Sequence, residues 1–371
     1  MMQISPETQL FIREHSSDDV RVLALQAKKY PDIDMPTVIT QIAGRKVAAE
    51  KIPSWWEIEK IWYPKHLSLE QCSSEITARY KARLLQGDSL TDLTGGFGID
   101  CSFLATGFKS ATYVERQEEL CEIAAHNFPV LNLNHINIKN EDGVTYLQAM
   151  SPVDCLFLDP ARRNEHGGKT VAISDCEPNV AELEELLLQK ANRVMIKLSP
   201  MLDLSLALKE LKQTQEVHIL SVNNECKELL ILLGQTSPAE ISIHCVNLFT
   251  KGTQKEQHFV FTREQEQCSE CTYTDSLETY LYEPNASLLK AGAFRSIAAA
   301  YPVRKLHPNS HLYTSDTFIE NFPGRIFRIV NQCSFNKKEV KENLADLKKA
   351  NVTVRNFPAT VAELRKRIHL A

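Results

Sequence analysis

The central part of the chain alternates short apolar runs with longer amphipathic ones, a pattern that predicts a mostly parallel sheet with helices on both faces. Seven apolar runs predict strands at residues 89–93, 111–115, 136–140, 154–159, 193–198, 217–222 and 229–233. Amphipathic runs between the first five predict helices, for example at residues 117–127 and 180–190. The link at residues 223–227 is too short for a parallel crossover, so we expect the last pair of strands to be antiparallel. The prediction is an α/β fold with a Rossmann-like, seven-stranded sheet.

The first 85 residues predict a helical N-terminal region. Apolar side chains recur at helical spacing in residues 20–29 and 38–49, and prolines punctuate the segment. Trp55, Trp56 and Trp62 fall in one short, proline-bounded stretch. We expect these indoles to pack in the core of the helical region, the alternative being a surface on which bases stack.

The chain changes character again beyond residue 235. Residues 241–249 and 258–262 predict a hairpin, and residues 264–275 are polar and predict a loop. A small α+β module of ferredoxin-like type follows, with elements predicted at residues 286–300 (helix), 326–333 (strand), 337–350 (helix), 352–356 (strand) and from 360 (helix). The predicted domains are therefore residues 1–85, 86–235 and 236–371.

The net charge of −5 conceals a strong asymmetry along the chain. Residues 86–285 carry 15 Lys/Arg against 30 Asp/Glu, whereas residues 286–371 carry 15 against 6, a net charge of +9. Lysine and arginine supply the phosphate contacts of proteins that bind nucleic acids. We therefore expect RNA or another nucleic acid as a partner of the basic C-terminal module, the alternative being a solvated helix surface.

Composition excludes several other classes. No apolar run approaches the ~20 residues of a membrane span, and residues 1–10 lack the pattern of a signal peptide. Ten scattered cysteines favour reduced thiols, so we expect a cytoplasmic protein without a membrane partner. Cys268 and Cys271 form a lone CxxC pair, and a structural zinc site needs four ligands, so no metal site is predicted.

The stretch Leu90-Thr-Asp-Leu-Thr-Gly-Gly-Phe-Gly-Ile-Asp100 is the most informative part of the sequence. It predicts a strand, a glycine loop and the start of a helix, the arrangement in which a backbone approaches a nucleotide-like ligand closely. Glycine adopts positive φ cheaply and leaves space where a Cβ would sit. The candidate cofactor-binding residues here are Asp92, Thr94, Gly95, Gly96 and Gly98.

Three acidic residues follow the next predicted strands at the edge where open α/β sheets bind ligands. Glu115 ends the second strand and could accept hydrogen bonds from ribose hydroxyls. Asp142 follows the third strand, where it either contacts an adenine amino group or simply makes a turn. Asp159-Pro160-Ala-Arg162 closes the fourth strand. The ordered set predicts a cofactor site far more strongly than any one member does.

Two common phosphate-binding loops do not fit this sequence. A dinucleotide site needs a third glycine where Cys101 stands, and a P-loop needs a Gly-Lys-Ser/Thr sequence that is absent. S-adenosylmethionine fits better, because such a loop meets a compact amino-acid and sulfonium group instead of a pyrophosphate. The antiparallel final pair of strands also fits a methyltransferase sheet better than a dehydrogenase sheet.

At this point the chain resembles a class I S-adenosylmethionine-dependent methyltransferase. The segment from Leu69 to Ala82 is similar to the one before the glycine loop in trimethylguanosine synthase-like RNA guanine-N2 methyltransferases. Overall the sequence most resembles a bacterial methyltransferase family with a THUMP-like C-terminal domain. Its hallmarks appear here as Glu70-Gln-Cys-Ser-Ser-Glu75, Asp92-Leu-Thr-Gly-Gly96, Leu158-Asp-Pro-Ala-Arg-Arg163, Lys197-Leu-Ser-Pro-Met-Leu-Asp203, Asn224-Glu-Cys-Lys-Glu228 and Glu283-Pro-Asn-Ala286.

The resemblance implies catalytic roles for Asp159, Pro160 and Arg162. Amino-methyltransferases carry an Asp/Asn-Pro-Pro-aromatic turn here, whose acid and a following carbonyl accept hydrogen bonds from an exocyclic amine. In this sequence Ala161 replaces the second proline and Arg162 replaces the aromatic residue. The Arg162 guanidinium could stack on a base, hold a phosphate, or pair with local acids.

Two further features bear on the substrate. RNA uridine-C5 enzymes need a cysteine nucleophile near the end of strand five, and the sequence there, Lys197-Leu-Ser-Pro-Met201, has none. Lys197 and Ser199 are candidates to line the substrate pocket, although Lys197 could instead pair with Asp203. The leading hypothesis is N-methylation of a base in structured RNA, such as tRNA or rRNA. The alternatives are a small-molecule or protein methyltransferase, and a non-catalytic RNA-binding protein.

Overall fold

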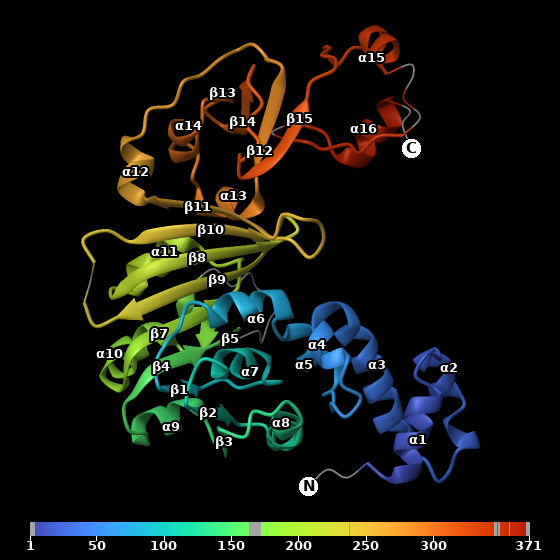
Figure 1. Ribbon diagram of the computed structural model, residues 1–371. Coiled ribbons are helices and arrows are strands. Elements are labelled where there is room, and N and C mark those ends of the chain that lie inside the picture. The colour runs from blue at the N-terminus through green and yellow to red at the C-terminus, as the bar shows by residue number, and fades with distance from the viewer. Residues whose placement is uncertain are drawn as a thin grey trace. The chain divides into compact units, whose positions relative to one another are not determined.

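A computed structural model of the 371-residue chain describes residues 4–162, 172–236, 238–344, 347, 349–355 and 357–368 (Figure 1). The chain forms two compact units, one of residues 1–222 and 227–241 and the other of residues 223–226 and 242–371. No helix among the described residues is both long and apolar enough to traverse a lipid bilayer.

A mostly parallel sheet forms the centre of the first unit. Its strands are β1 (Ser89–Asp92), β2 (Ser110–Glu115), β3 (Ile136–Asn140), β4 (Val153–Leu158), β7 (Ala191–Leu198), β8 (Thr214–Val222) and β9 (Glu225–Gly234). They lie in the order β8-β9-β7-β4-β1-β2-β3. The five strands from β7 to β3 are parallel, and β9 runs antiparallel to β7. All seven predicted strands are confirmed, and so is the predicted α/β fold.

The antiparallel end of this sheet follows from two asparagines. Asn223 and Asn224 join β8 to β9 and both have positive φ, +50° and +67°. Two consecutive left-handed residues make the turn that best matches the twist of a hairpin, and asparagine tolerates that conformation better than most residues do. The strands at the centre, β4 and β7, are buried along most of their length, as expected for strands covered on both faces.

Helices connect the parallel strands. They are α7 (Ile99–Ala105), α8 (Glu118–Val130), α9 (Gly143–Ala149), α10 (Val180–Lys190) and α11 (Leu204–Glu210), with the short segments β5 (Ala161–Arg162), η2 (Ile173–Asp175) and β6 (Cys176–Glu177) between β4 and α10. Asp142, Asn179 and Asp203 cap the amino ends of α9, α10 and α11. Each cap satisfies backbone N–H groups that the first helical turn leaves free.

The N-terminal region is helical, as the sequence predicts. Its helices are α1 (Pro6–Glu14), α2 (Val20–Leu25), η1 (Ala27–Lys29), α3 (Met35–Lys51), α4 (Pro53–Trp56), α5 (His66–Gln71) and α6 (Glu75–Ala82). Trp55 is buried against the ring of Phe97, and Trp62 is half-buried and stacks on His126 with 3.7 Å between ring centroids. Trp56 remains 42% exposed, so the prediction that the indoles are core residues fails for it.

The second unit begins with an antiparallel hairpin of β10 (Ser242–Leu248) and β11 (Glu256–Thr262), close to the predicted one. A four-stranded antiparallel sheet follows, of β12 (Tyr280–Pro284), β13 (Arg304–His307), β14 (Ser310–Ser315) and β15 (Gly324–Arg328) in the order β13-β14-β12-β15. Its helices are α12 (Arg263–Cys268), α13 (Ala286–Ala291), α14 (Ser296–Ala300), α15 (Lys337–Asn343) and α16 (Val361–Ile368).

Several predictions for this unit were wrong in detail. The predicted loop at residues 264–275 contains α12, which Thr262 and Gln265 begin with a reciprocal capping box. The predicted helix at residues 286–300 divides at Gly292, whose φ of +77° ends α13. Residues 352–355 are not in a strand, and Asn356, the last residue of that predicted strand, lies outside the described residues.

Candidate functional site: the glycine loop and an ion cluster

The glycine loop joins β1 to α7, and its backbone is fixed by hydrogen bonds at both ends. The Gly95 N–H donates to the Val114 carbonyl at 2.8 Å, and the Gly98 N–H donates to the Gly95 carbonyl at 2.9 Å. Gly98 caps α7 in the left-handed region, with φ of +87°. The predicted strand, loop and helix are therefore present in that order.

The three glycines meet different demands. A Cβ on Gly95 would lie 2.3 Å from the Tyr113 ring, which is buried, so the residue at position 95 must be glycine. Gly96 and Gly98 need glycine for their positive φ instead. Around Gly96, the Thr94 carbonyl oxygen, at 3.7 Å, is the one described atom near the place a Cβ would take. The loop thus leaves open space beside its backbone at Gly96.

Glu115 ends β2 beside this loop, as predicted. One carboxylate oxygen accepts from the Gly96 N–H and the other from the Gln117 N–H, both at 2.8 Å. The side chain is therefore fixed by backbone donors, and each of its oxygens keeps a second lone pair for a ligand.

Asp92 lies beneath the loop and is 1% exposed. Its Oδ1 accepts from the Thr94 N–H at 2.9 Å, whereas its Oδ2 is buried with no hydrogen-bond partner among the described residues. Burial raises the pKa of Asp92 to about 8, and the carboxylates of Asp100, Asp159 and Glu115 add to this effect.

Asp142 follows β3 and caps α9, so its carboxylate is already in use. Oδ1 accepts from the Val144 and Thr145 N–H groups, both at 3.0 Å. A Cβ on Gly143 would lie 2.2 Å from the Leu93 carbonyl oxygen, so α9 begins directly against the end of β1. The turn that the sequence allowed as an alternative is present, and the adenine contact stays a prediction.

Asp159 and Pro160 follow β4, and Pro160 is buried. The Asp159 N–H donates to the Thr94 hydroxyl at 2.6 Å, which links the end of β4 to the glycine loop. Arg162 belongs to β5, which pairs with β6, but its side chain and Arg163 lie outside the described residues. The predicted base or phosphate contact of Arg162 therefore stays a prediction.

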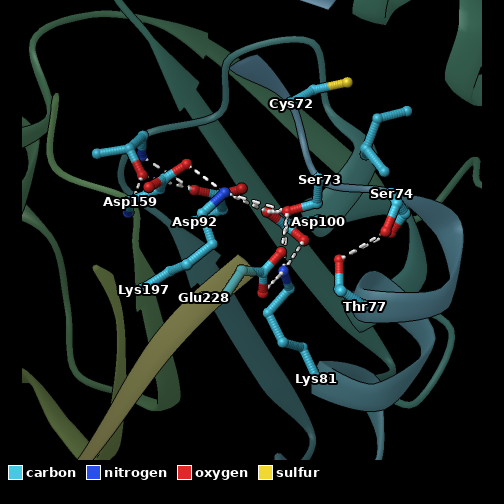
Figure 2. A network of polar contacts seen from close by, with 12 residues as sticks. Cys72, Ser73, Ser74, Thr77, Lys81, Asp92, Asp100, Asp159, Lys197 and Glu228 are labelled. Atoms are coloured by element: carbon cyan, nitrogen blue, oxygen red, sulfur yellow. Dashed lines mark hydrogen bonds and ion pairs between the residues drawn. The ribbon is translucent and has the colours of Figure 1, made fainter. Parts of the chain in front are cut away.

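The Asp159 side chain is also the outermost member of a group of five ionic side chains and one serine, here called the ion cluster. Its members are Ser73, Lys81, Asp100, Asp159, Lys197 and Glu228. Figure 2 shows that these side chains converge from α6, α7, β7, β9, the end of β4 and the link before α6. Segments far apart in the sequence thus meet at the site.

Lys81 is the inner cation of the cluster and is 0% exposed. Its ammonium nitrogen lies 2.9 Å from Asp100 Oδ1, 2.6 Å from Glu228 Oε2 and 2.8 Å from Ser73 Oγ. A buried ammonium is stable only where acceptors replace its water, and these three do so.

Lys197, at the end of β7, is the outer cation. Its ammonium lies 2.5 Å from Asp159 Oδ2, 3.2 Å from Asp100 Oδ2 and 3.1 Å from Ser73 Oγ. Burial alone would lower the pKa of Lys197, but Asp159, Asp100 and Glu228 outweigh it and hold that pKa well above its usual range. Burial would likewise raise the pKa of Asp100, and Lys81 and Lys197 hold it below its usual range instead.

The sequence missed most of this cluster. Ser73, Lys81, Asp100 and Glu228 were not predicted as site residues, although Ser73 and Glu228 lie in two of the hallmark segments. The suggested Lys197–Asp203 pair is wrong, because Asp203 caps α11 and Lys197 pairs with Asp159 and Asp100. The Ser199 hydroxyl accepts from the Met201 N–H at 3.2 Å.

Comparisons with known proteins show which families this chain is similar to. Residues 280–323 match the model of a ferredoxin-like domain, and residues 324–371 match the model of a THUMP domain-like segment. A search of curated proteins returned no match. The crystal structure of a provisionally assigned methyltransferase from Porphyromonas gingivalis is 34% identical, covers 100% of this chain and 94% of that one, and has a TM-score of 0.86.

Weaker likenesses extend to other methyltransferases. An S-adenosylhomocysteine complex of a provisionally assigned methyltransferase from Streptococcus mutans and an rRNA methylase from Streptococcus thermophilus are each 14% identical. Each covers 43% of this chain, with 96% and 93% of their own chains covered and TM-scores of 0.32 and 0.31. These two likenesses are too slight to support a shared function. The match to the Porphyromonas gingivalis protein, at 34% identity over the full length, is strong enough to establish the family. This chain belongs to the family of class I methyltransferases that carry a THUMP-like C-terminal domain.

Proposed function

We propose that the protein uses S-adenosylmethionine to methylate an exocyclic amine of a base in structured RNA. The observation that carries this proposal is the Asp159 carboxylate, which stands at the ligand-binding edge of the sheet beside the glycine loop. One of its oxygens is paired with Lys197, and the side chain keeps 37% of its exposure. A substrate can therefore reach it.

The glycine loop suits the cofactor in three respects. The space beside Gly96 admits a ligand close to the backbone, and the buried Oδ2 of Asp92, which has no hydrogen-bond partner among the described residues, can form a hydrogen bond with it. Glu115 keeps free lone pairs for ribose hydroxyls. When bound, S-adenosylmethionine would supply an electrophilic methyl group on a sulfonium.

Asp159 and Pro160 would orient the acceptor. The free oxygen of Asp159 accepts a hydrogen bond from the amine, which directs the nitrogen lone pair toward the cofactor side of the edge. Pro160 fixes its own φ, so the turn that carries Asp159 is rigid. The amine needs no strong base before attack, because its nitrogen can release a proton to Asp159 or to water after it has been methylated.

The charge of the second unit supports RNA as the substrate. Residues 324–371, the THUMP domain-like segment, carry 11 Lys/Arg against 4 Asp/Glu, whereas residues 280–323 carry 4 against 3. The basic character is thus confined to one segment, which would dock the polyanion. Arg162 would contact the base or a phosphate.

The deciding experiment measures transfer of a tritiated methyl group from S-adenosylmethionine into total RNA of a deletion strain. We expect wild-type protein to label RNA and Asp159→Ala to lose about 10²–10³-fold in rate, as when one transition-state hydrogen bond is removed. Calorimetry with S-adenosylhomocysteine should show unchanged binding for Asp159→Ala and weaker binding for Asp92→Asn. Mass spectrometry of the labelled nucleosides identifies the methylated atom. Label in protein or small molecules, with none in RNA, would contradict the proposal.

The role of the basic segment has its own test. Replacing the exposed side chains of Arg365, Lys366 and Arg367 on α16 with glutamine should weaken RNA binding and lower the slope of log K against log salt by up to ~2. The matched control removes the same charge from the first unit, at Arg21, Lys28 and Lys29. Equal losses in both triple variants would show that overall charge, and not this segment, governs binding.

A further inference from the structure

The two oxygens of the Asp159 carboxylate have different surroundings. Oδ2 lies 2.5 Å from the Lys197 ammonium, whereas Oδ1 has no partner among the described residues. In Figure 2 Asp159 stands at one side of the ion cluster, with Lys197 beside it and Lys81 and Glu228 farther in. Within the described part of the chain, the carboxylate is therefore held by one oxygen and free at the other.

Lys197 itself has little freedom to move. It is 7% exposed, and Asp100 Oδ2 and Ser73 Oγ hold its ammonium at 3.2 and 3.1 Å. Asp100 and Ser73 are fixed in turn by the fully buried Lys81, whose ammonium nitrogen lies 2.9 Å from Asp100 Oδ1 and 2.8 Å from Ser73 Oγ. Lys197 thus places a positive charge at a defined point of the ligand-binding edge.

The charges of the ion cluster do not cancel. Two ammonium groups face three carboxylates, and of these Asp100 and Glu228 are 9% exposed whereas Asp159 is 37% exposed. Burying an uncompensated charge is costly, so the surplus negative charge resides on the member that solvent or a substrate can reach. That member is Asp159.

We propose that Lys197 is a positioning residue for the methyl acceptor, which it serves by holding Asp159 ionised with its free oxygen directed to the substrate. The inference rests on the proposed function and gives a physical reason for its amine acceptor. A carboxylate paired with a fixed ammonium accepts a hydrogen bond well. Burial raises the pKa of Asp159 above its usual value, and Lys197 opposes that rise, which makes Asp159 a weaker base than burial alone would. The site therefore selects an acceptor that already has a nucleophilic lone pair and an N–H to donate, a base amine, over a hydroxyl that must first lose its proton.

The pH dependence of Lys197→Met distinguishes positioning from a structural role. Without the ammonium, burial and the Asp100 carboxylate still raise the pKa of Asp159, and among the described cations the more distant Lys81 is left to oppose them. Its pKa then rises, so the rate falls as the pH drops through the new pKa and recovers as the pH increases. We expect kcat for methyl transfer into RNA to fall at least ~10-fold at pH 7 and to recover by pH 9, with KM within about twofold of wild type. An unchanged pH profile would overturn the proposal.

A double-mutant cycle tests whether Lys197 acts through Asp159. Lys197→Met should cost little further activity in an Asp159→Asn background, because the group it positions is already neutral. Additive losses would show that Lys197 acts elsewhere. Lys197→Arg should retain most activity and the wild-type pH profile. Lys197→Gln, which keeps hydrogen-bonding capacity, replaces the methionine variant in both tests if that variant does not fold.

A second readout does not depend on the substrate. In protein labelled with ¹³C at the aspartate carboxyl carbons, the Asp159 resonance is assigned by its loss in Asp159→Asn. We expect this resonance to titrate at least about one pH unit higher in Lys197→Met than in wild type. Equal titration overturns the inference even if RNA is methylated. A shifted titration without methylation of RNA supports the positioning role and overturns the proposed function instead.

Discussion

Asp92 in the glycine loop and Asp100 in the ion cluster lie eight residues apart, are both buried, and have opposite pKa shifts. Burial raises the pKa of Asp92 to about 8, and the described groups that bond its carboxylate belong to Thr94 and include no cation. Lys81 and Lys197 hold the pKa of Asp100 below its usual range although Asp100 is buried as well. One loop is built by backbone hydrogen bonds, and the neighbouring cluster is built by ion pairs.

The two constructions suit different tasks. Backbone donors and glycines leave open space beside Gly96 and an Asp92 oxygen with no hydrogen-bond partner among the described residues, which favour a ligand. Ion pairs between side chains of distant segments restrict the motion of those side chains, which favours a fixed orientation of one of them. The cofactor surface and the acceptor surface of the proposed enzyme therefore differ in their physical basis, and three substitutions test that difference.

The largest expected effect comes from the inner cation of the cluster. Lys81→Met leaves Asp100 and Glu228 buried without their shared partner, so the free energy of unfolding should fall by about 3–5 kcal/mol. Lys109 is the matched control, because it also pairs with an aspartate, Asp88, but 79% of its side chain is exposed. Lys109→Met should cost less than ~1 kcal/mol in urea unfolding. Similar costs for both lysines would show that the cluster is no more than a set of surface ion pairs.

A steric change in the glycine loop should have the next largest effect. Gly95→Ala places a Cβ 2.3 Å from the ring of Tyr113, which packs edge-on against Phe128 and cannot withdraw. We expect a loss of about 1–3 kcal/mol of stability and loss of S-adenosylhomocysteine binding in calorimetry. Gly107→Ala is the control, since the nearest described atom to its Cβ is the Leu104 carbonyl oxygen at 3.7 Å. If Gly95→Ala binds the ligand normally, the close approach at this loop is not what shapes the site.

The third effect, the smallest when counted per pH unit, concerns the dependence of stability on pH. The pKa of Asp92 is higher in the folded protein than in the unfolded chain, so between about pH 4 and pH 8 the folded state holds a proton that the unfolded state has lost. This contribution to stability is complete below pH 4 and declines as the pH rises, by at most about 1.4 kcal/mol per pH unit. Asp92→Asn should remove that decline, so its stability relative to wild type should increase from pH 5 to pH 8 in urea titrations. A difference that is constant over this range would contradict the shift.

The strands and the loop were predictable because their signals are local. Strands such as β4, β7 and β9 contain continuous apolar runs, and β3 alternates Ile136 and Ile138 with polar residues. The glycines at positions 96 and 98 are visible in the sequence, and both have the positive φ that favours glycine. The acids at strand ends were predictable because the carboxyl ends of parallel strands share one edge. The role of Asp142 could not be predicted in the same way, because an aspartate at this position can serve either as a helix cap or as a ligand contact.

The second unit was harder to predict for a related reason. Strands β12, β13 and β14 are half-buried, four to six residues long and antiparallel, so their pattern is weak next to that of a buried parallel strand. The sequence predicted only β15 of the four, and it extended the helices α13 and α15 beyond their ends. The helical pattern of side chains continues past Gly292, but the left-handed backbone conformation of that residue ends the helix.

By itself, the sequence determined the α/β sheet, the strand-to-helix loop with its glycines, and the identity of the acids at the ligand-binding edge, because each depends on residues close together in the chain. Only the tertiary structure decided the environment of those acids. Lys197 reaches Asp159 from β7, Lys81 reaches Asp100 from α6, and Glu228 joins them from β9. Charges within a few ångströms decide whether a buried carboxylate is protonated, or ionised and held by a cation. The residues that carry these charges are far apart in the chain, so the sequence does not show that they are neighbours.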